Sequence, residues 1–262
     1  TGSNKQCLDI LKSLKQIKLT DIPDLEIQFP NDLNINTLNT DIITAMIDCG
    51  LRVAHISVES GSQYVQDKLI NKRAKLDRLK PFVDYLHSQG IIVKLIFILG
   101  FPGETKQLMR ETIEFARAME ADWCIFNIAT PLLGTPMYDQ FVQRGCIDGD
   151  IDIIGNADFK VRAFDTEEIS AKELNELAYE ANLDINFLNN RLIRTGQYID
   201  ALGIFNEVVA KYEFHVFALF CLETCYRELG EMSELKNIQN RINKLAIDND
   251  DAKQMIEKYG HL

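Results

Sequence analysis

The sequence predicts an α/β domain with parallel strands, followed by a C-terminal all-α domain of helical-repeat character. Before about residue 145, short apolar runs alternate with stretches of helical spacing, which is the rhythm of βα units. After about residue 166, the apolar positions follow helical spacing alone. The expected division is therefore an α/β domain at 1–145, a linker at 146–165 rich in Gly, Asp and Asn, and a helical domain at 166–262.

Four strands are predicted from short apolar runs. Leu25–Phe29 alternates apolar and polar residues and stops at Pro30. Ile91–Leu99 is almost continuously apolar, as expected of a parallel strand with both faces buried. The other two predicted strands are Val53–Val58 and Trp123–Ala129. Because helical stretches separate all four, right-handed βαβ connections and a parallel sheet are expected.

The helices around these strands are marked by apolar spacing and by stop signals. Leu38–Cys49 has helical spacing and ends at Gly50, and Leu76–Ser88 is closed by Gly90. Further helices are predicted at Leu8–Ile17, Tyr64–Leu69 and Glu104–Met119.

The helical tail contains a weak internal repeat. Gly196 and Gly230 stand in similar segments 34 residues apart, and apolar positions around them correspond. This is the tetratricopeptide spacing of a helix-turn-helix unit. The alternative is an ordinary antiparallel helical tail whose period is a coincidence. Two copies are too few for a free solenoid, so they would have to pack on the first domain.

Composition excludes several classes of protein. The 28 basic and 39 acidic side chains give a net charge of −11, which makes nucleic acid an unlikely partner because such binders need a basic surface. No apolar run reaches the roughly 18 residues of a membrane span. Six cysteines do not make a disulfide framework, and no secretory signal opens the sequence, so a reduced, cytoplasmic compartment is expected.

The end of the second predicted strand is the first candidate site. Strand alternation places Ser57 and Glu59 on one face, which would be the inside of a barrel. Glu59 would then stand at the open end, where a carboxylate suits an ammonium group or ribose hydroxyls, and Gly61 would let a ligand approach the backbone. The alternative is that Glu59 and Ser60 merely cap the helix that follows near Ser62.

Two further strand ends are unusual. In Gly100-Phe101-Pro102-Gly103, the glycines free the backbone on both sides of the proline, and exposed amides there could hold a flat heterocycle or a carboxylate. The alternative is a plain turn in which Glu104 favours the helix N-terminus. Ala129–Tyr138 holds two prolines and a glycine, which predict a rigid loop directly after a strand.

In this order and spacing, the three strand ends resemble the later strands of radical S-adenosylmethionine enzymes, in particular the subgroup that often carries an N-terminal cobalamin-binding domain. The resemblance covers roughly residues 5–145. The segments that carry it are Glu59–Gln63, Ile70–Lys72, Gly100–Thr105 and Pro131–Tyr138.

The resemblance implies a partial TIM-type barrel and a set of cofactors. Members of the family use a 4Fe-4S cluster to reduce S-adenosylmethionine and release a 5′-deoxyadenosyl radical. By this likeness Glu59, Ser60 and Gly61, with Ser57, would face the ribose or methionine end of the cofactor. Gly100, Phe101, Pro102 and Gly103, and the backbone from Ile128 to Thr130, would line the adenine. The use of cobalamin is left open.

The sequence departs from the family at the cluster. The family's C-x3-C-x2-C motif is absent, and the one suggestive pair, Cys221 and Cys225, lies in a predicted helix where buried thiols pack as small apolar groups. No histidine pair has metal-ligand spacing, so no metal ligand is predicted in this chain. Because Thr1-Gly2-Ser3 looks like a cloning remnant and the chain enters the fold late, we expect a truncated piece of a longer enzyme.

Two functions from different classes remain. The first is the C-terminal portion of a radical S-adenosylmethionine enzyme that modifies an unknown substrate, with this chain alone inactive for want of the cluster. The second is a non-catalytic interaction scaffold made of a degenerate barrel and helical repeats, with a protein partner on the repeats. The retained strand-end motifs favour the first.

Three further expectations concern the surface. The open edge at Leu25–Phe29 should be covered by a helix or by a second copy in a homodimer. The basic run from Lys72 to Lys80 is either a solvated helix face or a contact to phosphate or nucleic acid. Lys94, inside an apolar strand, either reaches out to solvent or points into the barrel.

Overall fold

The structure, a computed structural model, describes residues 4–29, 32–36, 39–147 and 159–259. Its contacts divide the chain into two compact units, Thr1–Ala181 and Asn182–Leu262. The boundary lies later than the linker expected at 146–165, because the chain after residue 158 packs back on the first unit. The backbone N–H of Ile128, for example, donates to the carbonyl of Phe159 at 2.7 Å. Residues 148–158 of the expected linker lie outside the described residues.

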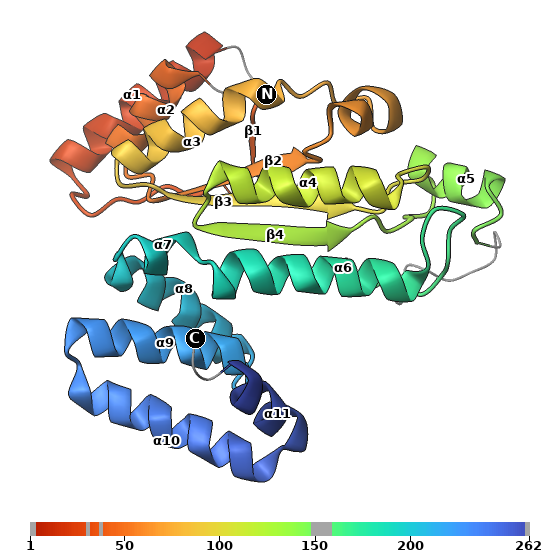
Figure 1. The fold of residues 1–262 in the computed structure, drawn as a ribbon. Coiled ribbons are helices and arrows are strands. Elements are labelled where there is room, and N and C mark those ends of the chain that lie inside the picture. The colour runs from red at the N-terminus through yellow and green to blue at the C-terminus, as the bar shows by residue number, and fades with distance from the viewer. Residues whose placement is uncertain (1–3, 30–31, 37–38, 148–158, 260–262) are drawn as a thin grey trace. The chain divides into compact units, whose positions relative to one another are not determined.

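A four-stranded, wholly parallel sheet forms the centre of the first unit, in the order β1-β2-β3-β4 (Figure 1). The strands are β1 Leu33–Asn34, β2 Val53–Glu59, β3 Ile92–Leu99 and β4 Trp123–Ile128. In the ladder, Ile56 pairs with Leu33 on one side and with Leu95 on the other. The predicted class, a parallel α/β domain, is confirmed.

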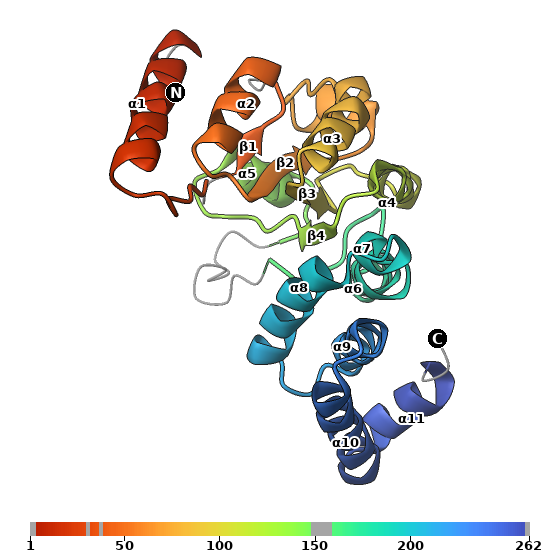
Figure 2. The ribbon, with the colours of Figure 1, turned by 90° about the vertical axis from the view of Figure 1, so that its left-hand side faces the viewer.

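Helices follow the strands in the order expected of βα units. Figure 2 shows α2, α3 and α4 on one side of the sheet, and α6 lies beside β4 in both views. In chain order the elements are α1 Asn4–Thr20, α2 Thr40–Asp48, a π-helix at Val65–Leu69, a 3-10 turn at Leu76–Arg78, α3 Leu79–Ser88, α4 Lys106–Met119, α5 Pro136–Gln143 and α6 Ala171–Leu183.

The strands bury alternate side chains against these helices. In β2 the residues Ala54, Ile56 and Val58 are at most 1% exposed, whereas the residues between them are half-buried. β3 and β4 repeat the alternation. The almost continuous apolar run of β3 is thus packed against helices on one face only, and the opposite face of the sheet stays partly open.

The predicted strand Leu25–Phe29 is wrong in its extent. Only Ile27 bridges to the sheet, at Leu51, and the edge position belongs to β1 instead. The backbone of Leu25 is used elsewhere, because its N–H donates to Ile22 at 3.0 Å and its carbonyl accepts from Lys18 Nζ. Groups committed to a local turn cannot extend a ladder.

The second unit is all helical in its described residues. Its elements are a π-helix at Asp184–Leu188, α7 Arg191–Arg194, α8 Tyr198–Lys211, α9 Val216–Leu229, α10 Met232–Asp248 and α11 Asp250–Tyr259. Gly196 and Gly230 share a left-handed backbone, with φ of 72° and 74°. The first helix of the supposed repeat is broken, however, whereas its counterpart α9 is continuous. The tetratricopeptide likeness therefore stays a prediction.

Within the parts of the chain that the structure describes, none of the helices combines the length and the apolar character that crossing a bilayer requires.

Candidate functional site

The face of the sheet away from the helices carries half-buried side chains in rows set by the register. His55, Lys94 and Trp123 form a row near the amino ends of the strands. Lys94 therefore lies on the open face of the sheet. Ser57 and Glu59 are also half-buried and lie toward the carboxyl end of β2, the end at which parallel α/β folds bind ligands.

Glu59 has an unusual backbone and a sheltered carboxylate. Its φ is +69°, a left-handed conformation that glutamate rarely adopts, and the β2–β3 register shifts at the same point. Its side chain is 16% exposed, and Oε1 lies 3.1 Å from Lys72 Nζ. Strained residues of this kind persist where the surroundings hold them, and they cluster at functional sites.

Other left-handed residues gather around the same strand end. Asp32, with φ of 57°, accepts a hydrogen bond at Oδ2 from Ser57 Oγ at 2.8 Å. Asn71 and Arg73, with φ of 51° and 53°, flank Lys72. Asp32 and Lys72 were missed as site residues by sequence reasoning. Nothing local marks Asp32, and Lys72 is placed beside Glu59 only by the loop conformation.

Ser60 and Gly61 face α4 and not the open side of the sheet, and their expected ligand role stays a prediction. Ser60 is fully buried, and its Oγ lies 2.9 Å from Thr112 Oγ1 of α4. A Cβ at Gly61 would stand 2.4 Å from Phe115 Cβ, so glycine is needed for packing against α4. Ser60 Oγ also accepts from Ser62 N–H at 3.1 Å, a local turn contact just before the helix.

A buried glutamine fixes the end of β2. Gln66 is fully buried in the π-helix, and its Nε2 donates to the carbonyls of Val58 at 2.7 Å and Ser60 at 2.6 Å. Single π turns are frequent at functional sites. Gln66 thus holds the strand end that carries Glu59, and no motif in the sequence indicated it.

The loop after β3 uses its amides internally, contrary to expectation. Glu104 Oε2 accepts from the N–H of Gly100 at 2.6 Å and of Phe101 at 3.0 Å. These two amides are therefore not free for a heterocycle or a carboxylate. The carboxylate of Glu104 binds the turn and not the helix N-terminus, where Thr105 Oγ1 accepts from Leu108 N–H at 3.4 Å.

Two charged residues near this loop are buried: Glu104, and Arg162 from the segment after β4. Glu104 is 1% exposed, and desolvation raises its pKa from 4.5 to about 7, although the amides of Phe101 and Gly100 and the charge of Arg162 oppose this. Arg162 is 4% exposed, and desolvation lowers its pKa to about 10 against the opposing charges of Glu104, Cys146 and Glu168.

The remaining predicted residues surround this loop. Pro102 is buried and Gly103 half-buried. Ile128 is 1% exposed, with its N–H bound to Phe159. Thr130 is 8% exposed, and its Oγ1 donates to the carbonyl of Ile128 at 3.0 Å. These groups shape the ends of β3 and β4, whereas Ser57 and Glu59 lie at the end of β2.

A comparison with protein families shows which family this part of the chain resembles. Residues 4–116 match the model of the radical SAM superfamily. This segment is therefore similar to radical SAM domains. Proteins of that superfamily use S-adenosylmethionine and a 4Fe-4S cluster as cofactors.

Curated relatives of the radical SAM domain span several activities. An uncharacterized methyltransferase of Pyrococcus horikoshii is 30% identical over 151 residues, covering 56% of this chain and 30% of that protein. A tRNA-2-methylthio-N(6)-dimethylallyladenosine synthase of Clostridium tetani is 30% identical over 107 residues, or 39% of this chain and 23% of the relative. An anaerobic magnesium-protoporphyrin IX monomethyl ester cyclase of Rubrivivax gelatinosus is 28% identical over 117 residues, or 42% and 20%. The chain thus spans less than a third of each of these relatives.

Among solved structures, the methyltransferase TsrM of Kitasatospora setae, with cobalamin and a 4Fe-4S cluster bound, aligns with a TM-score of 0.48 and 16% identity. The alignment covers 57% of this chain and 31% of that protein.

The described residues of this chain do not fit the iron–sulfur cluster. They contain no group of three His, Cys, Asp or Glu side chains that could hold a metal ion. Burial raises the pKa of the Cys49, Cys124 and Cys221 thiols, and that of Cys225 to about 11. These four thiols are buried, and none of them belongs to a group of three possible ligands among the described residues.

The strand end at β2 fits S-adenosylmethionine better. Glu59 offers a sheltered carboxylate that can accept hydrogen bonds from hydroxyl or ammonium groups, and Lys72 offers an ammonium beside it. Opposite charges at one strand end match a ligand whose amino-acid portion carries both signs.

Proposed function

We propose that this chain carries the part of a radical SAM enzyme that binds S-adenosylmethionine along the carboxyl ends of the strands, and that the cluster ligands come from a part of the protein outside this sequence. Bound S-adenosylmethionine is the source of the 5′-deoxyadenosyl radical or the methyl group in this chemistry. On this proposal the whole protein modifies a substrate by radical chemistry, with methyl or methylthio transfer suggested by the relatives.

The observation that carries the proposal is Glu59. A left-handed backbone at a glutamate costs about 1–3 kcal/mol, and residues with this kind of strain cluster at functional sites. The carboxylate of Glu59 is mostly buried but still accessible to solvent. A ligand can therefore replace water and Lys72 as its hydrogen-bond partner. Ser57, tied to Asp32, lies beside it on the open face.

Calorimetric titration of the full 262-residue chain with S-adenosylmethionine tests the proposal. We expect saturable binding that Glu59→Gln weakens about 10- to 100-fold, the value of a hydrogen bond to a charged group. Glu114→Gln is the matched control, because Glu114 is 69% exposed on α4 and pairs only with Arg117. Binding that is absent, or equally strong in Glu59→Gln, would contradict the proposal.

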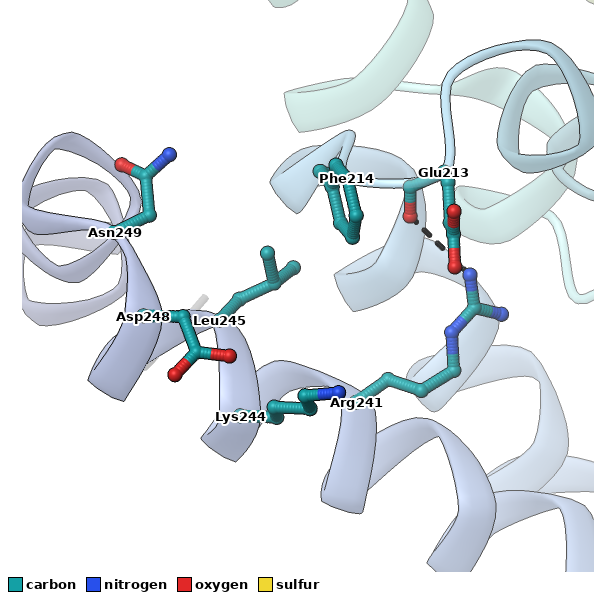
Figure 3. A pocket seen from close by; sticks show the side chains of 7 residues that line it. All are labelled: Glu213, Phe214, Arg241, Lys244, Leu245, Asp248 and Asn249. Carbon is teal, nitrogen blue, oxygen red and sulfur yellow. Dashed lines mark hydrogen bonds between the residues drawn. The ribbon is translucent and has the colours of Figure 1, made fainter.

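A second candidate function, the interaction scaffold, is favoured by a cavity in the second unit. The cavity measures about 350 Å³ and opens between the loop before α9 and the end of α10 (Figure 3). Phe214 and Leu245 form its apolar part, and Arg241, Lys244 and Asp248 are among its charged residues. Cavities of this size hold small ligands or single anchoring side chains.

The scaffold candidate predicts that the cavity binds a partner. Phe214 is 66% exposed, which is unusual for an aromatic side chain at a cavity. Phe214→Ala should then abolish capture of a partner by the full chain while leaving binding of S-adenosylmethionine unchanged. Phe159→Ala, at a residue 50% exposed in the first unit, is the control. Equal capture by both variants would remove the support that the cavity lends to this candidate.

A further inference from the structure

The peptide groups of Gly100 lie between two buried charges of opposite sign. On the amide side, Glu104 Oε2 accepts from Gly100 N–H. On the carbonyl side, Arg162 Nη2 donates to Gly100 O. Both side chains are at least 96% buried, so water does not screen them. Removing two ionised groups from water costs several kcal/mol each, and apolar residues would usually be more stable there.

Arg162 also reaches the neighbouring strand. The same Nη2 donates to the carbonyl of Ala129 at 3.2 Å, just after β4. One guanidinium nitrogen thus joins the carboxyl ends of β3 and β4. These are the two ends whose following loops contain Gly100–Gly103 and Thr130.

Arg162 is held in place by groups from other elements. Asn175 of α6 binds its backbone twice, accepting from Arg162 N–H at 2.9 Å and donating to Arg162 O at 3.0 Å. The guanidinium carbon lies 5.2 Å from the centre of the Phe141 ring and 5.1 Å from that of Phe164. Such cation–π contacts fix the orientation of the guanidinium plane.

Gly100 is shaped to this contact. A Cβ there would stand 2.6 Å from Arg162 Nη2 and 2.7 Å from Leu174 Cδ2, and the φ of +83° is one that L-residues avoid. Gly100, which the sequence analysis expected to line the adenine, leaves room for the arginine.

With the amino-acid portion of S-adenosylmethionine at Glu59 and Lys72, the rest of the ligand would extend along the neighbouring ends of β3 and β4. We propose that Arg162 is a positioning residue for this nucleoside end, because it ties the ends of β3 and β4 together and so sets the separation of the two loops that follow them. Glu104 holds the same turn from its other side, because its carboxylate accepts hydrogen bonds from the N–H groups of Gly100 and Phe101. The inference rests on the proposed function. It adds a residue from beyond the radical SAM match at 4–116 to the site.

The test is the affinity of the full chain for two probes, S-adenosylmethionine and 5′-deoxyadenosine. Arg162→Met should weaken both by the same factor, about tenfold or more, because it removes hydrogen bonds from a charged group that shapes the shared nucleoside end. Lys72→Met should weaken S-adenosylmethionine only. Arg162→Lys, which keeps the charge and a donor, should recover part of the affinity for both probes. Arg117→Met, at an exposed arginine of α4, is the control.

A second readout separates positioning from mere stability. In Arg162→Met, amide hydrogen exchange should accelerate at Ile128 and Ala129, and remain unchanged at Val93, whose N–H binds Asp122 at the other end of β3. If Arg162→Met does not fold, Asn175→Ala replaces it, since that variant frees the Arg162 backbone without removing the guanidinium.

The outcomes distinguish the two proposals. Unchanged affinity for both probes in a folded variant, with only a lower melting temperature, would overturn the role of Arg162. If the unaltered chain binds neither probe, the proposed function fails and the role of Arg162 in ligand positioning fails with it. Equal loss for both probes together with faster exchange at Ile128 and Ala129 would support both.

Discussion

Glu104→Gln should remove a distinct part of the pH dependence of stability in the first unit. Glu104 is 1% exposed, and its pKa rises from 4.5 to about 7 on folding. A group whose pKa is higher in the folded state stabilises that state below its unfolded pKa, and the stabilisation is lost as pH rises through the folded value. Between pH 5 and pH 8 these two pKa values correspond to a loss of about 2 to 3 kcal/mol in the free energy of unfolding.

Glutamine keeps an oxygen that can accept from Gly100 N–H and Phe101 N–H, but it does not titrate. The free energy of unfolding of the variant should therefore lack this pH-dependent loss of about 2 to 3 kcal/mol, whatever its absolute value. A loss of that size equals about two ordinary hydrogen bonds. The comparison is between the change in stability from pH 5 to pH 8 in the two proteins, so constant effects of the substitution cancel.

The assay is urea unfolding followed by the fluorescence of Trp123, the single tryptophan, which lies on β4 and reports the first unit alone. Glu114→Gln controls for the loss of a carboxylate at an exposed position. If the free energy of unfolding of Glu104→Gln falls with pH as steeply as that of the unaltered chain, Glu104 is ionised at pH 5, and the reasoning from burial is refuted.

The other predictions concern packing against α4 and a pH effect in the second unit. Gly61→Ala should destabilise the first unit by about 1–3 kcal/mol in urea unfolding, because its Cβ would lie 2.4 Å from Phe115 Cβ, and an equally stable variant would show that α4 can move away. His215 caps α9 by accepting from Ala218 N–H at 3.2 Å, and burial lowers its pKa, so the second unit should lose stability as pH falls below about 6.5. His215→Asn, which can cap without titrating, should flatten that loss in thermal melts followed by circular dichroism; an unchanged slope would implicate another group.

Much of the first unit could be predicted because its signals are local. The alternation in Val53–Val58 and the apolar run at Ile91–Leu99 identify strands by side-chain period, and Gly50 and Gly90 end helices through their backbone freedom. The failure at Leu25–Phe29 comes from backbone groups that a nearby turn already uses. An alternating pattern shows which residues can form a strand, but the ladder also needs free backbone groups, and Lys18 and Ile22 occupy those of Leu25.

In the candidate site, too, some features were visible in the sequence and others were not. Glu59 could be proposed because a carboxylate at a strand end is visible in the sequence. The sequence did not show that Ser60, Gly61 and Gly100 contact partners distant in sequence, namely Thr112, Phe115 and Arg162. A small or polar residue beside a strand end has the same sequence whether it faces a ligand or a helix.

The sequence by itself determined the parallel α/β class, the order of most strands and helices, the likeness to radical SAM enzymes and the lack of the family's cysteine motif. These features depend on period, spacing and residue type, which are properties of short segments. Only the tertiary structure decided which strand occupies the sheet edge, that Asp32 and Lys72 join Ser57 and Glu59, and that Glu104 and Arg162 enclose Gly100. The physical reason is that hydrogen bonds and burial act between groups brought together by folding, and sequence distance does not encode that proximity.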